Sequence, residues 1–466
     1  MKRIRQISLA ILILIGAAFL MAGSGNSADA PRGFTVVEYW EKWSGREAQQ
    51  MQQIVDEFNS SIGQRDKIFV RFMSMTDVDQ KMLVATAAGV PPDIAGLWDQ
   101  QVSEFAALDA VEPLDDLARQ FGISSDTYLP VFWNGCHYNG HLYGLVSTAG
   151  TVALIYNKQM FRAAGLDPDR PPQTLDELDR DAAAIDTVDS SGQIDRAGYV
   201  PLAGWYLPLL SYWFGGDIFD AQSGRFTIDS PQTLRAYEWI QSYSRRLGRR
   251  ALMDFQNSLG AFDSPRNPIL AGKLAMQQQG PWMADYIAHL APAMSQVLVP
   301  TSDESKLARR ADNYAWGVAA FPSAVAGLKD VSYCSFDVMM IPRGARHPRE
   351  AFEFMAYVNR QDVAEKLATM QSKNTQLRKV SREFLANHPN PYIGVYEALA
   401  ASPNAHGVPP TPIWPEVFKE LNDDGQAVAL DGADPATVLA ASQRRLQAEY
   451  DHFMSLQNRR KQLGID

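Results

Sequence analysis

Short strand patterns alternate with helical patterns along this chain, and that alternation restricts the fold more than any other feature. Residues 34–40 read as a buried strand, and Ser44 and Glu47 have the S-x-x-E spacing of a helix capping box. The apolar residues that follow recur at helical spacing: Met51, Ile54, Val55 and Phe58. Strands that alternate with helices predict α/β lobes with mainly parallel sheets.

Two further segments extend this pattern. A helix is expected over 77–88 and a short strand over 93–97. Strand-like residues 144–146 and 152–156 flank the small residues 147–150, a break that suits a hinge.

Length and charge limit the number of domains and the kind of partner. At 466 residues the chain is too long for one ordinary core, so two lobes are expected. The formal net charge of -10 argues against a nucleic acid partner, because phosphate binding needs clustered Lys and Arg.

Residues 1–30 have the pattern of a secretory signal peptide. Lys2, Arg3 and Arg5 precede an apolar run over 7–22, and small residues follow it. We therefore expect export to the periplasm or another extracytoplasmic compartment. An uncleaved membrane anchor is the alternative, and the cleavage site stays open.

The chain shows little sign of catalytic or metal chemistry. His137 and His141 have a spacing that would suit a metal on a helix, but Asn139-Gly140 between them predicts a hairpin turn instead. Hydrolase, phosphate-loop and zinc-protease motifs were not found. No enzyme activity, cofactor or metal is expected.

The tryptophans carry the strongest functional signal. Five of the ten lie at or just after the ends of expected elements, beside Gly, Pro or acidic residues: Trp43, Trp98, Trp205, Trp282 and Trp414. Loops at strand ends are where α/β folds place ligands. Aromatic faces suit the C–H face of a sugar ring, and carboxylates and amides suit its hydroxyls. Trp239, inside a helical apolar pattern, is expected to pack in a core.

Several stretches together resemble a known family. They are residues 140–145, 153–158 with Phe161, Gly215-Gly216 followed by 228–231, 272–276 leading to Gly280-Pro281-Trp282, and 351–354. In this order they are similar to the extracellular solute-binding proteins, family 1, the sugar-binding receptors of ABC importers that include maltose-binding protein. The chain departs from the family at 332–337, which lacks the usual Gly-Gly pair, and at 374–378, which lacks a proline.

The resemblance implies the two-lobe, type II periplasmic binding protein fold, with the ligand between lobes joined by hinge crossings. The amino-terminal lobe would be 31–149 plus 316–361, and the carboxy-terminal lobe 150–315 plus 362–466. The ligand would be a sugar or oligosaccharide, the partners the membrane permease subunits of the importer, and the receptor a monomer.

The resemblance also implies a set of ligand-binding residues. The aromatic contacts would be Trp43, Trp98, Trp205, Tyr206, Trp282 and Trp414, and the polar contacts Glu41, Asp99, Thr148 and Thr151. Two other functions stay open: a receptor of the same fold for an amine or polyol held by cation–π contact, and a secreted carbohydrate-active enzyme.

The two cysteines, Cys136 and Cys334, could form a disulfide in an oxidising compartment. The family likeness puts both in the amino-terminal lobe. The alternative is that each is a small core residue.

Overall fold

The computed structural model describes residues 30–204, 206–260, 264–295 and 314–463. The expected signal segment, except Ala30, and Trp205 lie outside the described residues. Within the described residues, no helix combines the length and the apolar composition needed to cross a membrane.

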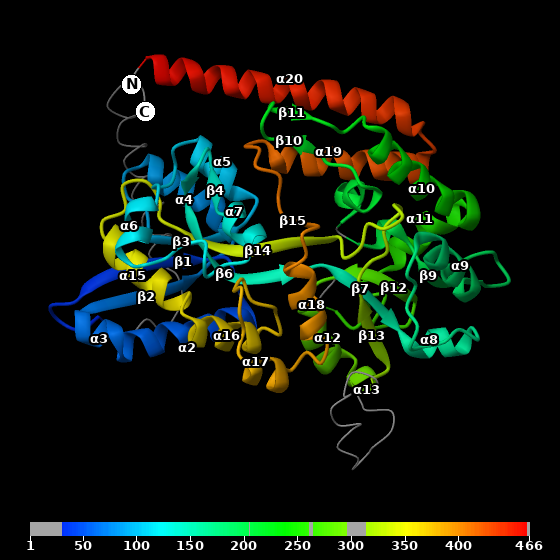
Figure 1. Cartoon of the computed structure of the whole chain (residues 1–466), viewed down its shortest axis with the longest axis horizontal. Coiled ribbons are helices and arrows are strands. Elements are labelled where there is room, and N and C mark those ends of the chain that lie inside the picture. Colours follow the sequence, from blue (N-terminus) through cyan, green and yellow to red (C-terminus); the bar gives the residue numbers. More distant parts are fainter. Residues whose placement is uncertain (1–29, 205, 261–263, 296–313, 464–466) are drawn as a thin grey trace, which may run out of the picture.

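The first sheet contains the expected opening strand as an interior strand, between β3 and the edge strand β2 (Figure 1). Its path is β15-β14-β3-β1-β2, and β6 pairs with β14 on the other side. The pairs of β1 with β2 and with β3 are parallel, whereas β14 is antiparallel to both β3 and β6. The strands are β1 (Thr35–Glu41), β2 (Ile68–Ser74), β3 (Ile94–Trp98), β6 (Gly144–Thr151), β14 (Ser332–Met340) and β15 (Ala405–His406).

Helices pack around this sheet, and the longer ones bury an apolar face. The helix expected after the first strand forms as α2, and it buries Met51, Ile54, Val55 and Phe58 as its spacing predicted. The helices of this part are α2 (Gly45–Ser60), α3 (Ile62–Asp66), α4 (Val78–Ala87), α5 (Gln101–Ala107), α6 (Asp115–Gln120), α7 (Pro130–Gly135), α15 (Pro348–Val358) and α16 (Gln361–Met370).

The second sheet has the order β13-β7-β12-β9-β8. Only β12 and β9 pair in parallel, while β7 is antiparallel to β12 and to β13. Both sheets are therefore mixed among the described strands. In the first sheet three of five pairings are parallel, those of β1 with β2, β1 with β3 and β14 with β15. In the second sheet only one of four is parallel, so the prediction of mainly parallel sheets is wrong for the second sheet. The strands are β7 (Ala153–Asn157), β8 (Thr187–Val188), β9 (Ile194–Tyr199), β12 (Leu274–Gln279) and β13 (Trp316–Ala319).

The remaining elements surround the second sheet or cover the side shared by both sheets, except the hairpin of β4 with β5, which packs with α5 and α7 beside the first sheet. In Figure 1 the long helix α20 runs along one edge of the molecule. They are α8 (Lys158–Ala163), α9 (Leu175–Ile185), α10 (Pro231–Leu247), α11 (Arg249–Ser258), α12 (Met283–Leu290), α13 (Pro292–Ser295), α17 (Arg382–Asn387), α18 (Ile393–Ala400), α19 (Trp414–Gln426), α20 (Pro435–Gln462), the 3-10 helices η1 (Pro201–Ala203) and η2 (Leu207–Phe214), the π-helix η4 (Ala427–Asp431), and the hairpins of β4 (His137–Tyr138) with β5 (His141–Leu142) and β10 (Phe219–Asp220) with β11 (Arg225–Phe226).

Each sheet has its own apolar core, here called the first core and the second core. Among the described residues that pack in the two cores, the chain changes core five times. Ala149 packs in the first core and Val152 in the second; Tyr333 packs in the second and Cys334 in the first. The third change lies between Leu367 and Ala368, and Ala400 then packs in the first core between Leu399 and Ile413 of the second.

These changes correct two of the expected lobe boundaries. The boundary expected at 316 lies instead near 333, because β13 pairs with β7 and its Trp316 is buried in the second core. The boundary expected at 361 moves to about 367, because α16 packs with α2 and contributes Val363 and Leu367 to the first core.

Three local predictions had different outcomes. The hairpin at Asn139-Gly140 is confirmed, with φ of 49° and 83°. The strand break at 147–150 is not formed, because β6 continues through these residues; its pairing with β14 shifts register opposite Asp337 and Val338, and the chain leaves the first core directly afterwards, between Ala149 and Val152. The capping box is wrong as well: Ser44 makes no side-chain cap, and the Glu47 carboxylate lies 3.6 Å from Nζ of Lys373.

Candidate functional site

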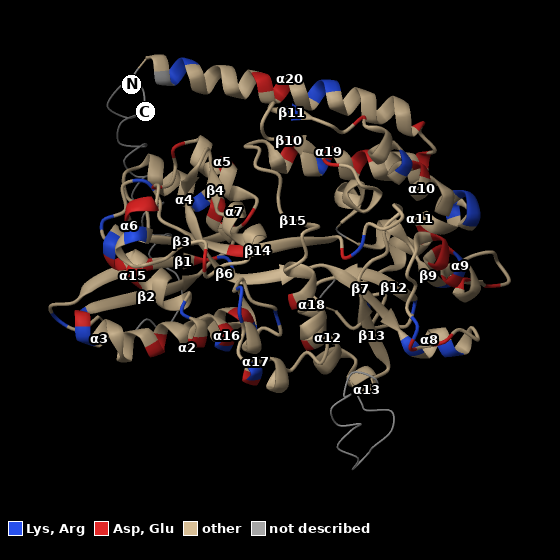
Figure 2. Cartoon of the chain, in the orientation of Figure 1, with Lys and Arg blue, Asp and Glu red and all other residues tan. Residues whose placement is uncertain are grey.

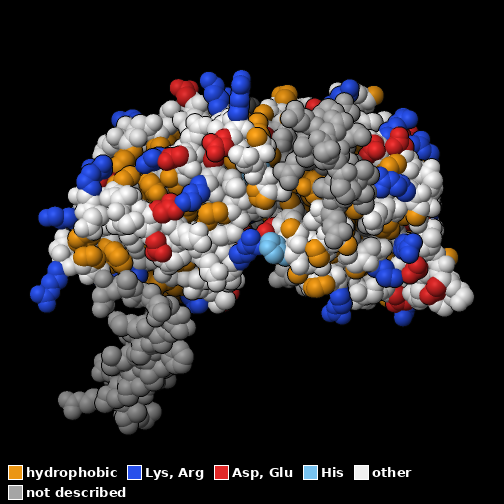
Figure 3. Space-filling model, turned by 90° about the horizontal axis from the view of Figure 1, so that it is seen from below, with side chains coloured by type: hydrophobic (Ala, Val, Ile, Leu, Met, Phe, Trp, Pro, Cys, Tyr) orange, Lys and Arg blue, Asp and Glu red, His pale blue; other side chains and the backbone are white. Residues whose placement is uncertain are grey.

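A cavity of about 280 Å³ lies between the two cores. A notch between the two halves of the molecule is visible in the space-filling view of Figure 3. The first core contributes residues at the end of β3 and along β6 and β14, and the second contributes η2, the loop after β12 and α19. The lining residues are Trp98, Asp99, Gln100, Ala149, Gly150, Tyr206, Leu209, Trp282, Tyr333, Ser335, Phe336, Asp337, Lys373, Trp414 and Phe418.

Aromatic rings from both cores wall this cavity. Trp98 directly ends β3, and its side chain is 44% exposed although it is large and apolar. Trp414 begins α19 on the other side and is buried. Tyr206 and Tyr333 approach each other to 6.0 Å between ring centroids. A ligand between the cores therefore meets ring surfaces on both sides.

Trp282 is positioned by two glycines. A Cβ atom on Gly150 would lie 2.7 Å from the Trp282 ring, and a Cβ atom on Gly280 would collide with the same ring. Gly150 lies on β6, where the chain leaves the first core, and Gly280 follows β12 of the second sheet. The indole can lie close to both backbones only because neither residue has a side chain.

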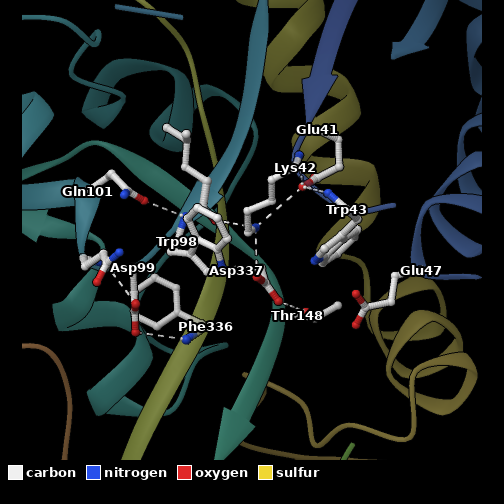
Figure 4. Close-up of polar contacts among 12 residues, drawn as sticks. Glu41, Lys42, Trp43, Glu47, Trp98, Asp99, Gln101, Thr148, Phe336 and Asp337 are labelled. Carbon is white, nitrogen blue, oxygen red and sulfur yellow. Dashed lines mark hydrogen bonds and ion pairs between the residues drawn. The ribbon is translucent and has the colours of Figure 1, made fainter. Parts of the chain in front are cut away.

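The polar floor of the cavity is organised around Asp337 (Figure 4). One carboxylate oxygen of Asp337 lies 2.9 Å from Nζ of Lys42; the other lies 3.0 Å from Nζ of Lys373 and accepts a 2.7 Å hydrogen bond from Thr148. Burial opposes ionisation of Asp337, but the two ammonium groups outweigh it and lower the pKa of this carboxyl group. Asp337 is thus the anion that the two buried cations share, and each cation has a second carboxylate farther away: Glu41 lies 3.5 Å from Nζ of Lys42 and Glu47 lies 3.6 Å from Nζ of Lys373.

The same two lysines cover aromatic rings. Nζ of Lys42 lies 5.2 Å from the ring centroid of Trp43 and 5.1 Å from that of Trp98. Nζ of Lys373 lies 5.3 Å from the Trp43 ring. The cation–π positions on Trp43 are therefore filled by side chains of the protein itself.

Glu41 lies beneath the floor and does not line the cavity. Its side chain is fully buried, its carboxylate packs directly on Gly96, and it accepts hydrogen bonds from Tyr39 Oη at 2.5 Å and from the backbone N–H of Lys42 at 2.8 Å. Burial raises the pKa of Glu41, against the opposing charge of Lys42. Its place indicates a structural role, holding the turn that presents Lys42.

Asp99 lines the cavity as a buried carboxylate. Burial raises the pKa of Asp99 to about 7, although it accepts hydrogen bonds from the backbone N–H groups of Phe336 at 3.1 Å and Gln100 at 2.9 Å. The group therefore changes charge near neutral pH and can accept or, when protonated, donate a hydrogen bond.

The expected ligand residues divide into two groups. Trp98, Asp99, Tyr206, Trp282 and Trp414 all line the cavity. Trp43, Thr148 and Thr151 are buried behind its lining, as Glu41 is, and Trp205 lies outside the described residues. The residues that sequence reasoning missed are Lys42 and Lys373, Asp337, and the rings of Tyr333, Phe336 and Phe418.

The expected disulfide is not formed, since Cys136 and Cys334 are both free, buried thiols. Cys334 Sγ lies 3.6 Å from Thr151 Oγ1, within the pairing of β14 with β6. Cys136 follows α7, where Phe336 packs closely against the neighbouring Gly135. Each cysteine is therefore a small core residue, the alternative that the sequence left open.

Two α/β cores with a cavity walled from both sides define a binding protein that holds a small ligand between two lobes. The family model described as bacterial extracellular solute-binding protein matches residues 42–365. The chain belongs to this family.

Individual relatives are distant. The maltotriose-binding protein of Pyrococcus abyssi (strain GE5 / Orsay) is 23% identical over 259 residues, which are 54% of this chain and 51% of that protein. The chain thus matches about half the length of this relative. The sn-glycerol-3-phosphate-binding periplasmic protein UgpB of Yersinia enterocolitica (serotype O:8 / biotype 1B, strain NCTC 13174 / 8081) is 26% identical over 218 residues, 45% of this chain and 47% of that protein.

A solved structure shares the fold. CpMnBP1 with mannobiose bound superposes with a TM-score of 0.73 at 24% sequence identity, and the match covers 88% of this chain and 98% of that one. The likeness confirms the α/β two-lobe, type II periplasmic binding protein fold that the resemblance implied.

Proposed function

We propose that this chain is the substrate-binding component of an ABC importer and that it binds a sugar or oligosaccharide in the cavity between its cores, without catalysis. The observation that carries the proposal is the composition of the cavity wall. Rings of Trp98, Trp282 and Trp414 offer apolar faces from both cores, and Asp99 and Gln100 offer hydrogen-bonding groups between them. Sugars need this combination, because each ring has an apolar C–H face and a rim of hydroxyl groups.

The relatives support a small hydroxylated ligand. One is named for maltotriose and one for sn-glycerol-3-phosphate, and the solved structure holds mannobiose. For this chain the charges of the cavity favour a neutral ligand. The ammonium groups of Lys42 and Lys373 are both paired with Asp337, which leaves neither as a dedicated phosphate partner.

An amine ligand is less compatible with the geometry. Such a ligand would need an open aromatic face beside a carboxylate, but Lys42 and Lys373 already fill this position on Trp43 and beside Asp337. A competing amine would have to displace a buried lysine, which is unfavourable.

The proposal extends to location and partners. A signal-like pattern over residues 1–30 and the family membership support export, and delivery would be to membrane permease subunits by a monomeric receptor. Figure 2 shows Lys and Arg interspersed with Asp and Glu over the described helices, which gives no support to a polyanionic partner.

A thermal-shift panel tests this function. It would contain manno- and malto-oligosaccharides, monosaccharides, sn-glycerol-3-phosphate and small amines. A sugar present at a hundredfold excess over its Kd should stabilise the protein by about 2.7 kcal/mol and raise its Tm. A panel in which no sugar raises the Tm, while an amine or a phosphate ester does, would contradict the proposal.

A further inference from the structure

A second cavity adjoins the first at Asp99. Its volume is about 460 Å³, larger than that of the first, and Asp99 lines both. It also lies between the cores, with the first core on one side, η2 and β10 on the other, and the segment after β15 between them. The lining residues are Asp99, Ser103, Val131, Asn134, Gly135, His137, Tyr212, Asp217, Phe219, Asp220, Ala221, Ala405, His406, Gly407, Val408, Pro409 and Pro410.

The second cavity contains an aromatic platform. The rings of Tyr212 and His406 stack with centroids 4.0 Å apart and planes inclined by 13°. Tyr212 is buried in the second core, and His406 pairs through its backbone with Tyr333, which lines the first cavity. The platform is thus tied to the same strand, β14, that forms the floor of the first cavity.

Several polar groups of the second cavity are hydrogen-bond acceptors, beside the hydroxyls of Ser103 and Tyr212 and the amide of Asn134, which both donate and accept. Asp217 and Asp220 contribute carboxylates. His137 Nδ1 lies 2.6 Å from the carbonyl oxygen of Trp133, which can only accept, so Nδ1 carries the proton and Nε2 is the acceptor of the neutral ring. Burial lowers the pKa of His137 and so favours this neutral form.

The charged side chains that line the second cavity are acidic. Among the described residues that line it there is no Lys or Arg, whereas three carboxylates are present, those of Asp99, Asp217 and Asp220. A ligand with a carboxylate or phosphate would meet like charges without a cation to compensate them. A ligand with many hydroxyl donors would find an acceptor for several of them.

Asp99 lines both cavities, and the second cavity offers hydrogen-bond acceptors and, among its described lining residues, acidic side chains without a cation. We therefore propose that the ligand is an uncharged oligosaccharide that extends from the aromatic cavity past Asp99 into the second cavity. This inference rests on the proposed function and adds the length and charge of the substrate. One end is held among Trp98, Trp282 and Trp414, and further sugar units lie on the His406 platform with hydroxyls directed to His137 and Asn134.

Calorimetric titration with oligosaccharides of increasing length tests the inference. The probes are mannobiose, mannotriose and mannotetraose, and maltose, maltotriose and maltotetraose, on the wild-type chain, His137→Phe and Asn134→Ala. Affinity should rise at least tenfold from the disaccharide to the tetrasaccharide of the preferred series. His137→Phe, which keeps a ring but removes the acceptor, should abolish most of this gain and leave disaccharide affinity unchanged.

Asn387→Ala is the matched control, because Asn387 ends α17 as an exposed asparagine that lines neither cavity; it should behave as wild type. Equal affinity for disaccharide and tetrasaccharide, or equal losses for both in His137→Phe, would overturn the extended ligand while leaving the sugar receptor intact. Tighter binding of an oligogalacturonate than of every neutral probe would overturn the charge assignment. Binding of no sugar by any variant would instead contradict the proposed function and this inference with it.

Discussion

Asp337→Ala should lower the free energy of unfolding by about 3–5 kcal/mol, the largest stability change expected for a single residue of the site. Asp337 is the shared counter-ion of Lys42 and Lys373, whose side chains are only 4% and 7% exposed. Its removal leaves two desolvated ammonium groups close together with one partner fewer. Urea unfolding followed by circular dichroism measures the change.

The control for this prediction is Asp423→Ala. Asp423 pairs with Lys419 within α19, but both side chains are more than 50% exposed, so the loss should stay within about 1 kcal/mol. The effect of Asp337 should also depend on pH. Because its folded pKa is lowered, its contribution is complete above the unfolded value of about 4 and is lost as the pH falls below that value. Equal losses for the two variants at pH 7 would show that Asp337 is not a buried counter-ion.

Trp282→Ala should weaken binding of the sugar found in the ligand panel by about 2 kcal/mol or more, roughly thirtyfold. The ring forms part of the cavity wall where β6 and the loop after β12 meet, so its loss removes a contact surface at the junction of the cores. Calorimetry on the folded protein measures the affinity.

Three variants separate ligand contact from fold stability. Gly150→Ala keeps the Trp282 side chain, but the added methyl group forces the indole to shift. This variant should weaken binding on the order of tenfold, about 1.4 kcal/mol. Gly394→Ala, where an added Cβ meets nothing within 4 Å, should leave the affinity unchanged. Trp239→Ala should instead destabilise the protein by about 3 kcal/mol with affinity intact, because its indole packs against the second core and donates to Asp179. The reverse ordering of Trp282 and Trp239 would contradict the assignment of cleft and core.

The aromatic part of the site could be predicted from the sequence, because the position of each tryptophan at the end of a strand was enough to place it near a ligand. Trp98 directly ends β3 and Trp282 closely follows β12, and strand ends in α/β proteins face ligands. Trp43 follows the same rule but lies behind the cavity lining, with Lys42 and Lys373 over its ring. The position of a tryptophan at a strand end does not show whether other side chains of the protein lie over its ring and keep a ligand from it.

The polar floor could not be predicted from local patterns. Lys42, Asp337 and Lys373 are distant in sequence, and a lysine that will be buried looks like one that will be solvated. The same limit explains Glu47, whose spacing from Ser44 indicated a cap although its carboxylate lies near Lys373. At Glu47 the expected local hydrogen bond is absent, and the carboxylate lies near a charge from a distant part of the chain instead.

The lobe boundaries failed for a topological reason. Alternation of strands and helices predicts α/β cores but not which sheet each strand joins. Trp316 begins a strand that the resemblance gave to the amino-terminal lobe, yet β13 pairs with β7 in the second sheet. The return to the first core occurs within β14, at Tyr333 and Cys334.

The central claim is that a sugar is held by both cores at once, and calorimetry on one variant from each wall tests it most directly. Trp98 belongs to the first wall and Phe418 to the second; neither is fully buried, so both alanine variants should fold. Trp98→Ala and Phe418→Ala should each weaken binding of the same sugar at least tenfold while the stoichiometry stays at about one. Loss of affinity in only one of the two variants, with the other equal to wild type, would show that the ligand binds on a single core and would contradict the account.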